Sequence, residues 1–196
     1  MVVSLKELNQ IYLADRQVEN MINKILVFPR HFVEKNIDLF NKHKIGIISI
    51  IDYPKDILLT NTFKDEKNIS QIPEISVCFN DITKDDYDQF DEANKKAYIL
   101  FNKKHAEYII NFVNIFKNEI DILIIHCEAG IARSGAVGYW ACRYLELDLN
   151  LFMKLNLYIL PNYFVYDILH KMSGLRIKND LKELFHSDDV DVNNIF

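Results

Sequence analysis

Short apolar runs alternate along the chain with segments in which apolar residues recur every three or four positions. The short runs, which predict strands, lie at 24–28, 44–51, 75–79 and 121–125. The run 44–51 is rich in Ile, as is typical of a strand that helices cover on both faces of a parallel sheet. Helical spacing is found from Pro29 to Phe40 and near 134–146, 149–158 and 163–173. This order predicts an α/β fold with a central, mostly parallel, twisted sheet flanked by helices.

From Lys84 onward, the spacing of apolar residues changes from a period of two to a period of about 3.6 residues. Its apolar positions at helical spacing are Tyr98, Phe101, His105, Ile109, Phe112 and Phe116. They predict one apolar face on a long helix, and we interpret His105 on that face as a core or boundary residue rather than a ligand. Residues 52–56 predict a turn, and residues 57–73 are expected to be irregular.

A single domain is expected over residues 1–196, since the chain is long enough and apolar enough (49% hydrophobic) to bury a substantial core. The core is expected at about 24–173. The polar, acidic segment of about 180–196 is interpreted as a solvated or frayed C-terminal tail, with a docking segment as the alternative.

Charge and composition narrow the class of partner. The net charge of −5 gives no general attraction to nucleic acid or to an anionic membrane, and neither is expected as a partner. The N-terminus turns polar too soon for a signal peptide, and no apolar run is long enough to span a membrane. The three cysteines, Cys78, Cys127 and Cys142, are too few and too scattered for a disulfide framework or a zinc knuckle. The oligomeric state stays open.

The segment from His126 to Gly135 joins the last strand to a helix and holds a cysteine and an arginine with five residues between them, in the order HCEAGIARSG. A tight loop at this point turns backbone N–H groups inward to bind an anion, and the helix N-terminus adds positive potential. The same positive potential favours the nucleophilic thiolate of Cys127. Arg133 can hold two phosphate oxygens with its planar fork. The pattern predicts a phosphate site with a nucleophile, and a reactive thiolate requires a reducing compartment, which indicates the cytoplasm.

Each remaining position of the loop has an expected part. The phosphate-binding loop comprises Glu128, Ala129, Gly130, Ile131, Ala132 and Arg133. Gly130 is expected where the backbone needs a positive φ or a close approach. His126 is expected to hold the loop by hydrogen bonds, and Ser134 to donate to the thiolate and ease its departure.

The string His-Cys-x-x-Gly-x-x-Arg-Ser-Gly resembles the signature of the cysteine-dependent protein tyrosine phosphatase superfamily, in its compact dual-specificity-like or small bacterial and phage-type branch. The resemblance implies phosphomonoester hydrolysis through a phosphocysteine, without a metal or another cofactor. It also implies a phosphorylated protein as substrate: phosphotyrosine, with phosphoserine and phosphothreonine left open.

The resemblance further implies a general acid upstream of the signature. Asp81, in Phe79-Asn80-Asp81-Ile82, matches the phenylalanine-x-aspartate-isoleucine pattern of the small bacterial relatives. It precedes Cys127 by 46 residues (127 − 81), which is longer than expected for compact dual-specificity enzymes. The alternatives are Asp85, Asp86 and Asp88, although acidic residues before a helix also arise from ordinary N-capping.

Pro161-Asn162 resembles the start of the proline-asparagine-x-x-phenylalanine element of dual-specificity enzymes, which would make Asn162 a supporting residue behind the loop. The equally plausible interpretation is a turn in which Asn162 caps the next helix. Cys142 lies 15 residues after Cys127 (142 − 127) and is interpreted as a packed helix residue; a protective disulfide with Cys127 is the alternative.

Other functions compete with this one. A catalytically silent phosphoprotein-binding module would keep the fold without turnover. Phosphoinositide substrates are disfavoured because no variable loop position is basic, and RNA 5′-phosphate because the chain is acidic overall and has no Arg/Lys cluster near the loop. Low-molecular-weight phosphatases and arsenate reductases are disfavoured because their Cys-x5-Arg motif lies near the N-terminus, whereas it is central here. A rhodanese-like sulfur transferase is disfavoured because it would need neither Ser134 nor an upstream acid.

Overall fold

The computed structural model of the chain describes residues 21–40, 43–53 and 72–176. The strands are β1 (Lys24–Pro29), β2 (Ile45–Ile51), β3 (Glu74–Cys78) and β4 (Ile122–Cys127). The helices are α2 (Arg30–Phe40), α4 (Lys84–Gln89), α5 (Glu92–Ala97), α6 (Lys103–Phe116), α7 (Arg133–Tyr144), α8 (Leu149–Leu155) and α9 (Tyr163–Met172). The acidic tail, most of the turn expected at 52–56 and most of the irregular segment expected at 57–73 lie outside the described residues.

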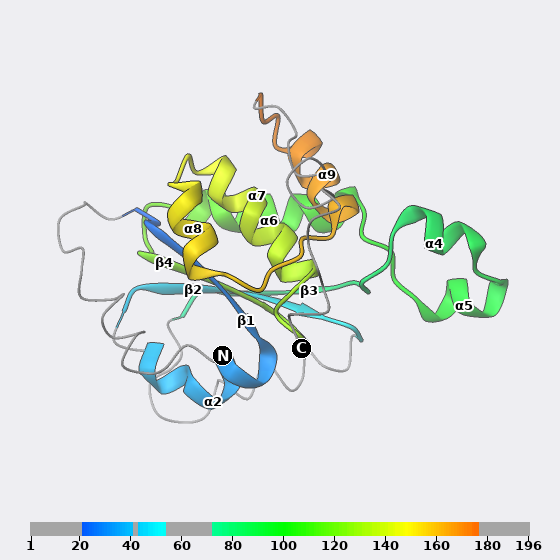
Figure 1. The fold of residues 1–196 in the computed structure, drawn as a ribbon, viewed down its shortest axis with the longest axis horizontal. Helices are drawn as coiled ribbons and strands as arrows, with labels where there is room; N and C mark the ends of the chain where they lie inside the picture. The colour runs from blue at the N-terminus through cyan, green and yellow to red at the C-terminus, as the bar shows by residue number, and fades with distance from the viewer. Residues whose placement is uncertain (1–20, 41–42, 54–71, 177–196) are drawn as a thin grey trace.

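The four strands form one parallel sheet in the order β1-β4-β2-β3 (Figure 1). The expected α/β fold with a central parallel sheet is confirmed. In the register, Pro29 is opposite Cys127, Ser49 is opposite His126, and Ile51 is opposite Cys78. The carboxyl ends of all four strands therefore meet at one edge, which is where ligands bind in open parallel sheets.

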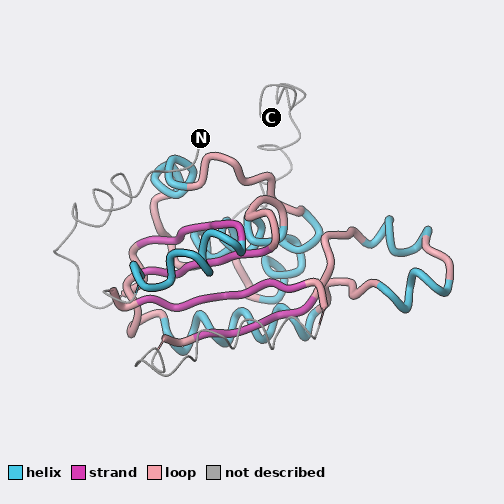
Figure 2. The backbone as a smooth tube through the Cα atoms, turned by 90° about the horizontal axis from the view of Figure 1, so that it is seen from below, coloured by secondary structure: helices cyan, strands magenta, loops and turns pink. Residues whose placement is uncertain are grey.

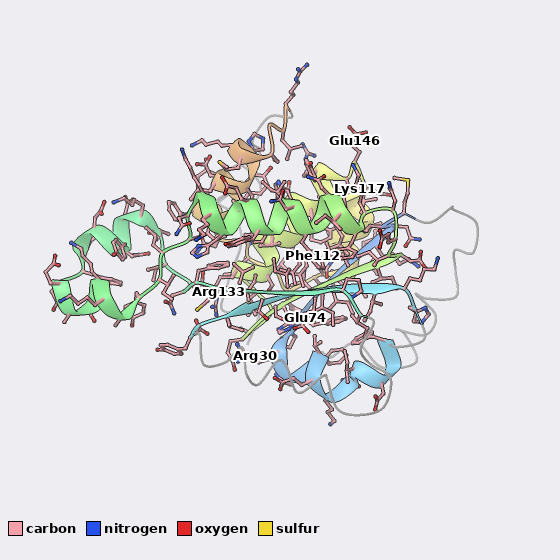
Figure 3. All side chains as sticks on the ribbon, turned by 180° about the vertical axis from the view of Figure 1, so that it is seen from behind. Arg30, Glu74, Phe112, Lys117, Arg133 and Glu146 are labelled. Carbon is pink, nitrogen blue, oxygen red and sulfur yellow. The ribbon has the colours of Figure 1, made fainter. Side chains whose placement is uncertain are left out.

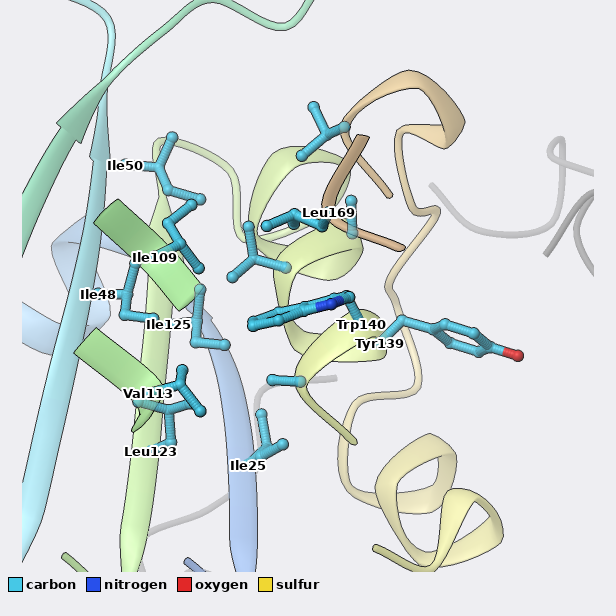
Figure 4. Close-up of a cluster of buried hydrophobic side chains, with 14 of the residues drawn as sticks. Ile25, Ile48, Ile50, Ile109, Val113, Leu123, Ile125, Tyr139, Trp140 and Leu169 are labelled. Carbon is cyan, nitrogen blue, oxygen red and sulfur yellow. The ribbon is translucent and has the colours of Figure 1, made fainter. Parts of the chain in front are cut away.

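Strand side chains alternate between two apolar layers, one on each face of the sheet. On one face α2 covers a cluster formed by Leu26, Phe28, Val33, Phe40, Ile45, Ile47, Ile122 and Ile124. On the other face α6, α7 and α9 pack over a larger cluster, in which Trp140 lies among Ile25, Ile48, Ile50, Ile109, Val113, Leu123, Ile125 and Leu169 (Figure 4). Both faces of the sheet are thus covered, as the apolar run of β2 indicates.

The prediction of a long helix that includes Tyr98 and Phe101 is wrong at its N-terminal end. Asn102 caps α6 with its side chain and forms a reciprocal capping box with His105, so that the helix begins at Lys103. The residues before it form α4 and α5, two short helices without a buried residue, which project from the body of the molecule (Figures 1 and 2). We call residues 81–98 the finger. Its two helices account for much of the unexpectedly long separation between Asp81 and Cys127.

His105 is half-buried and stacks on Phe79, with the two ring centroids 5.9 Å apart. Burial, with a smaller contribution from Lys104, lowers the pKa of His105. Its interpretation as a boundary residue of the core is confirmed. Cys142 is fully buried in α7, where burial raises the pKa of its thiol to about 12, so it is a packed helix residue as expected.

No helix in the described parts of the chain combines the length and the apolar character needed to cross a membrane.

Candidate active site

The segments that leave the carboxyl ends of the four strands supply the polar groups of one site. Arg30 follows β1, the signature loop follows β4, Asp52 follows β2, and residues 79–81 follow β3. Arg30 and Arg133 lie at this end of the sheet in Figure 3. Sheet order and parallel direction thus bring together segments that are far apart in sequence.

Gly130 determines the path of the signature loop. Its φ is 72°, and a Cβ at this position would lie 2.4 Å from the backbone carbon of Phe28 and 2.4 Å from the nitrogen of Pro29. Both expectations for Gly130, a positive φ and a close backbone approach, are confirmed. The loop is also held to the end of β1, because the Arg30 N–H donates to the Glu128 carbonyl at 3.3 Å and Arg30 Nε lies 3.5 Å from the Glu128 carboxylate.

Cys127 is buried at the floor of the loop, with a relative exposure of 2%. Its sulfur accepts a hydrogen bond from the Gly130 N–H at 3.3 Å and lies 3.1 Å from the Ser134 hydroxyl oxygen. Both groups can donate to a negatively charged sulfur, which suits a nucleophile that must attack as a thiolate and leave as one.

The N-terminus of α7 carries no side-chain cap of its own. Ala132 occupies the N-cap position and has no side-chain acceptor, although Ser, Thr, Asp or Asn is favoured there. The first N–H groups of this helix of 12 residues are therefore available to an anion bound in the loop.

Arg133 is held in place by a carboxylate that the sequence analysis did not single out. Its Nη1 donates to Asp52 Oδ1 at 2.7 Å and to the Phe79 carbonyl at 3.0 Å, and its Nη2 donates to Asp52 Oδ2 at 3.3 Å. Among the described residues, the buried Nε of Arg133 has no hydrogen-bond partner. One side of the guanidinium is thus fixed by Asp52, while the Nε side retains a donor. A carboxylate directly after a buried parallel strand is the signal that could have identified Asp52.

Asn162 connects the loop after β3 to the signature loop. Its Nδ2 donates to Asp81 Oδ1 at 2.9 Å, and its backbone N–H donates to the Ala132 carbonyl at 3.1 Å. Its Oδ1 also accepts from the Val165 N–H and caps α9. The two interpretations of Asn162 as supporting residue and as helix cap are compatible, because its backbone N–H bonds to the signature loop while its side chain bonds to Asp81 and caps α9.

The other acidic candidates make local contacts in α4. Asp86 forms a capping box with Thr83, whose side-chain and backbone hydrogen bonds lower the pKa of Asp86. Asp88 pairs with Lys84 one turn away, and Asp85 lies in the same first turn. N-capping and an i,i+4 pair account for Asp86 and Asp88 without a role in the site.

His126 is fully buried beneath the loop and bonds toward β2. Its Nε2 lies 2.8 Å from the Ser49 hydroxyl oxygen, and that hydroxyl donates to Glu74 Oε1 at 2.9 Å. Because the Ser49 hydroxyl donates its proton to Glu74, its oxygen can accept a hydrogen bond from His126 Nε2, which favours the tautomer protonated there; Nδ1 has no hydrogen-bond partner among the described residues. Burial, with a smaller contribution from the positive charge of Arg30, lowers the pKa of His126 to about 4. His126 is therefore neutral near pH 7.

Within the described residues no three His, Cys, Asp or Glu side chains come together as a metal site. The groups of the site that could bind an anion are N–H donors and the Arg133 guanidinium.

A comparison with protein-family models gives no match, and neither does a comparison with curated protein sequences. Among solved structures, DUSP15 is similar with a TM-score of 0.51, at 16% identity over 86% of this chain and 94% of that chain. PTPMT1 is similar with a TM-score of 0.48, at 13% identity over 80% of this chain and 93% of that chain. Tk-PTP in its active form is similar with a TM-score of 0.47, at 14% identity over 79% of this chain and 93% of that chain. The likeness to DUSP15 carries the assignment of the fold.

The signature string His-Cys-x-x-Gly-x-x-Arg-Ser-Gly lies between β4 and α7, and the likeness to DUSP15 extends over most of both chains. The chain therefore has the fold of the cysteine-dependent protein tyrosine phosphatase superfamily, in its compact dual-specificity-like form.

Proposed function

We propose that this protein is a phosphomonoester hydrolase that acts through a phosphocysteine and needs no metal. The observation that carries the proposal is the environment of the Cys127 sulfur. It lies against the Gly130 N–H and the Ser134 hydroxyl, in the loop that also contains Arg133, whose Nε has no hydrogen-bond partner in the described parts of the chain. A buried thiol, inward N–H donors and a fixed guanidinium together suit attack on a bound phosphate.

In the first step the Cys127 thiolate attacks phosphorus in line with the leaving oxygen. An S–P bond forms as the P–O bond breaks, and Asp81 gives its proton to the departing alkoxide or phenoxide. Arg133 and the loop N–H groups stabilise the charge on the other phosphate oxygens. The enzyme then holds a phosphocysteine, and Asp81 is ionised.

In the second step water replaces sulfur on phosphorus. The Asp81 carboxylate takes a proton from the water as its oxygen attacks, the S–P bond breaks, and inorganic phosphate leaves. Ser134 donates to the departing thiolate, which its hydroxyl already approaches at 3.1 Å. Both Asp81 and Cys127 return to their starting protonation states.

Asp81 is favoured over Asp85, Asp86 and Asp88 as the acid. A chain of two hydrogen bonds connects Asp81 through Asn162 to the signature loop. Asp86 and Asp88, by contrast, make local contacts in α4. Asp81 is also exposed, so that it can meet a substrate that enters from solvent.

Phosphorylated proteins are the proposed substrates, with phosphotyrosine first and phosphoserine and phosphothreonine as further candidates. The variable loop positions carry no basic side chain, and the acidic one, Glu128, pairs with Arg30. This favours a singly phosphorylated group over a polyphosphorylated inositol lipid or an RNA end, which attract clustered Lys and Arg.

The first test is hydrolysis of para-nitrophenyl phosphate in EDTA and a reductant. Wild type is expected to turn over, Cys127→Ser to lose activity by about a thousandfold or more, and the control Cys78→Ser, a partly buried cysteine of β3, to keep it. Residual activity close to wild type in Cys127→Ser would refute the mechanism. If neither wild type nor Cys127→Ser hydrolyses the substrate but both bind tungstate, an analogue of phosphate, the proposed hydrolase is replaced by the alternative of a catalytically silent phosphoprotein-binding module.

A further inference from the structure

Asn80 lies between two groups of the proposed mechanism, and its own side chain is buried at a relative exposure of 5%. It follows β3 and occupies the variable position of the phenylalanine-x-aspartate-isoleucine pattern. Every polar atom of its side chain has a partner in this part of the chain. The partners lie on two different sides, the base of the finger and the residue that holds Arg133.

On one side Asn80 closes the base of the finger. Its backbone N–H donates to the Ile99 carbonyl at 2.8 Å, and its Oδ1 accepts the Ile99 N–H at 2.7 Å. These two bonds join the residues that flank the finger. Asp81 is the first residue of the finger, so this clamp fixes the backbone from which the proposed acid projects.

On the other side Asn80 contacts the carboxylate that holds the arginine. Its Nδ2 donates to Asp52 Oδ1 at 3.2 Å, and the same oxygen accepts from Arg133 Nη1 at 2.7 Å. The preceding residue, Phe79, adds its carbonyl to the same Nη1 at 3.0 Å. Asn80 therefore orients Asp52, and Asp52 sets which side of the guanidinium faces the loop.

We propose that Asn80 is a positioning residue that holds the general acid and the phosphate-binding arginine in register; this rests on the proposed function. The position requires an acceptor toward the Ile99 N–H and a donor toward the Asp52 carboxylate. An amide supplies both in one flat group, whereas a carboxylate of the same shape supplies only the acceptor. Asn80 acts on the reaction through Asp52 and Asp81 and has no assigned contact with substrate.

The sharpest variant is Asn80→Asp, which keeps the shape and the bond to Ile99 but sets a second carboxyl about as far from Asp52 as the present 3.2 Å. Two carboxylates this close share one proton, which the pair takes up as the pH falls. The shared proton then restores a hydrogen-bond donor between residue 80 and Asp52. The other ionisable groups placed beside this pair are Arg133 of α7, which bonds to Asp52, Asp81, which follows Asn80 in the chain, and His105 of α6, which stacks on Phe79.

Near neutral pH, Asn80→Asp is expected to weaken tungstate binding about tenfold relative to wild type, the effect of one lost hydrogen bond to a charged group. Turnover of phenyl phosphate, which needs its leaving group protonated, is expected to fall further than that of para-nitrophenyl phosphate. Measured as a ratio to wild type at each pH, both losses are expected to shrink in mildly acidic solution.

Two further variants separate positioning from folding. Asn102→Asp, at the exposed cap of α6, makes the same chemical change where Asp is also a good cap, and is expected to leave activity and tungstate binding unchanged. For tungstate affinity, Asn80→Ala combined with Asp52→Asn is expected to be no worse than Asp52→Asn alone, because Asn80 acts on Arg133 through Asp52.

Equal losses on both substrates at every pH, or additive losses in the double variant, would overturn the role of Asn80. The role of Asn80 would also be overturned if Asn80→Asp had the melting temperature, tungstate affinity and turnover of wild type. If wild type turns over no substrate, the proposed function fails, yet tungstate binding by the variants still decides whether Asn80 orients Arg133. If wild type binds no tungstate either, both proposals fall.

Discussion

At the scale of single residues, Gly130 is the position at which a side chain is least compatible with the loop. Gly130→Ala is expected to abolish turnover and lower the melting temperature, because the new Cβ would meet the backbone of Phe28 and Pro29 at 2.4 Å. Gly174→Ala is the matched control: its φ is also positive, at 67°, but nothing lies within 4 Å of a Cβ there. The control is expected to cost only about 1 kcal/mol, the strain of a left-handed residue. Equal costs at the two sites, with activity retained in Gly130→Ala, would contradict this account of the loop.

Asp81 is tested by the leaving group of the substrate. Asp81→Asn is expected to slow phenyl phosphate by about a hundredfold or more and para-nitrophenyl phosphate much less, because nitrophenolate leaves without a proton. Steady-state kcat/KM on the two substrates measures the difference. Asp85→Asn, on the first turn of α4, is the control and is expected to match wild type. If Asp85→Asn shows the leaving-group effect instead, the acid lies in α4.

At the scale of secondary structure elements, β1 is an edge strand that gains hydrogen bonds from a side chain. Val27 N–H donates to Asn156 Oδ1 at 2.7 Å, and Asn156 Nδ2 donates to the Ile25 carbonyl at 3.1 Å. The amide of Asn156 thus bonds to the free edge of β1 as a neighbouring strand would, and it is buried at 4% exposure. Because Asn156 also ends α8, this helix stops before residue 158, the expected end.

Asn156→Ala is expected to destabilise the protein by about 2–4 kcal/mol, because it leaves a buried N–H and a buried carbonyl of β1 without a partner. Urea unfolding of the variant measures this cost. Asn36→Ala, which removes a bond to the Phe32 carbonyl one turn earlier in α2, is the control and is expected to cost less than 1 kcal/mol. A similar cost for both variants would show that the contact with β1 contributes little.

Most elements could be predicted because each buries a regular apolar pattern. All four strands were expected within two residues of their ends; α6 and α7 pack against the sheet, and α9 packs against these two helices. The finger could not be predicted, because α4 and α5 bury no residue and so leave no periodic apolar signal. Their caps, Thr83 and Asp91, are instead local signals.

At the scale of the whole molecule, the site depends on the order of the strands. Cys127, Gly130 and Arg133 could be predicted because they are contiguous in sequence and share one loop. The contacts that Asp52 and Asn80 make with each other and with Arg133 could not, because they arise only when β2 lies between β4 and β3 in the sheet. Sequence spacing carries no information on that order until the pairing is known.

The buried His126 links the stability of the whole molecule to pH. Its pKa is about 4 in the folded protein against 6.5 when exposed, so the stabilisation is fully present above pH 6.5 and is lost as the pH falls toward 4. The loss is expected to be on the order of 3 kcal/mol over this range. His126→Gln, which keeps an N–H toward Ser49 without a titrating ring, is expected to show a shallower pH dependence of the unfolding free energy. The same slope in both proteins would mean that His126 does not titrate this way.

In the proposed mechanism the phosphoryl group passes through Cys127. The most direct test is acid quenching during turnover of a phosphotyrosine peptide, followed by mass spectrometry of the peptide that contains residues 126–135. Phosphate is expected on the Cys127 sulfur in wild type and on no residue of this peptide in Cys127→Ser. Turnover in EDTA with no phosphate trapped on Cys127 under any quench time, and with Cys127→Ser still active, would contradict this mechanism.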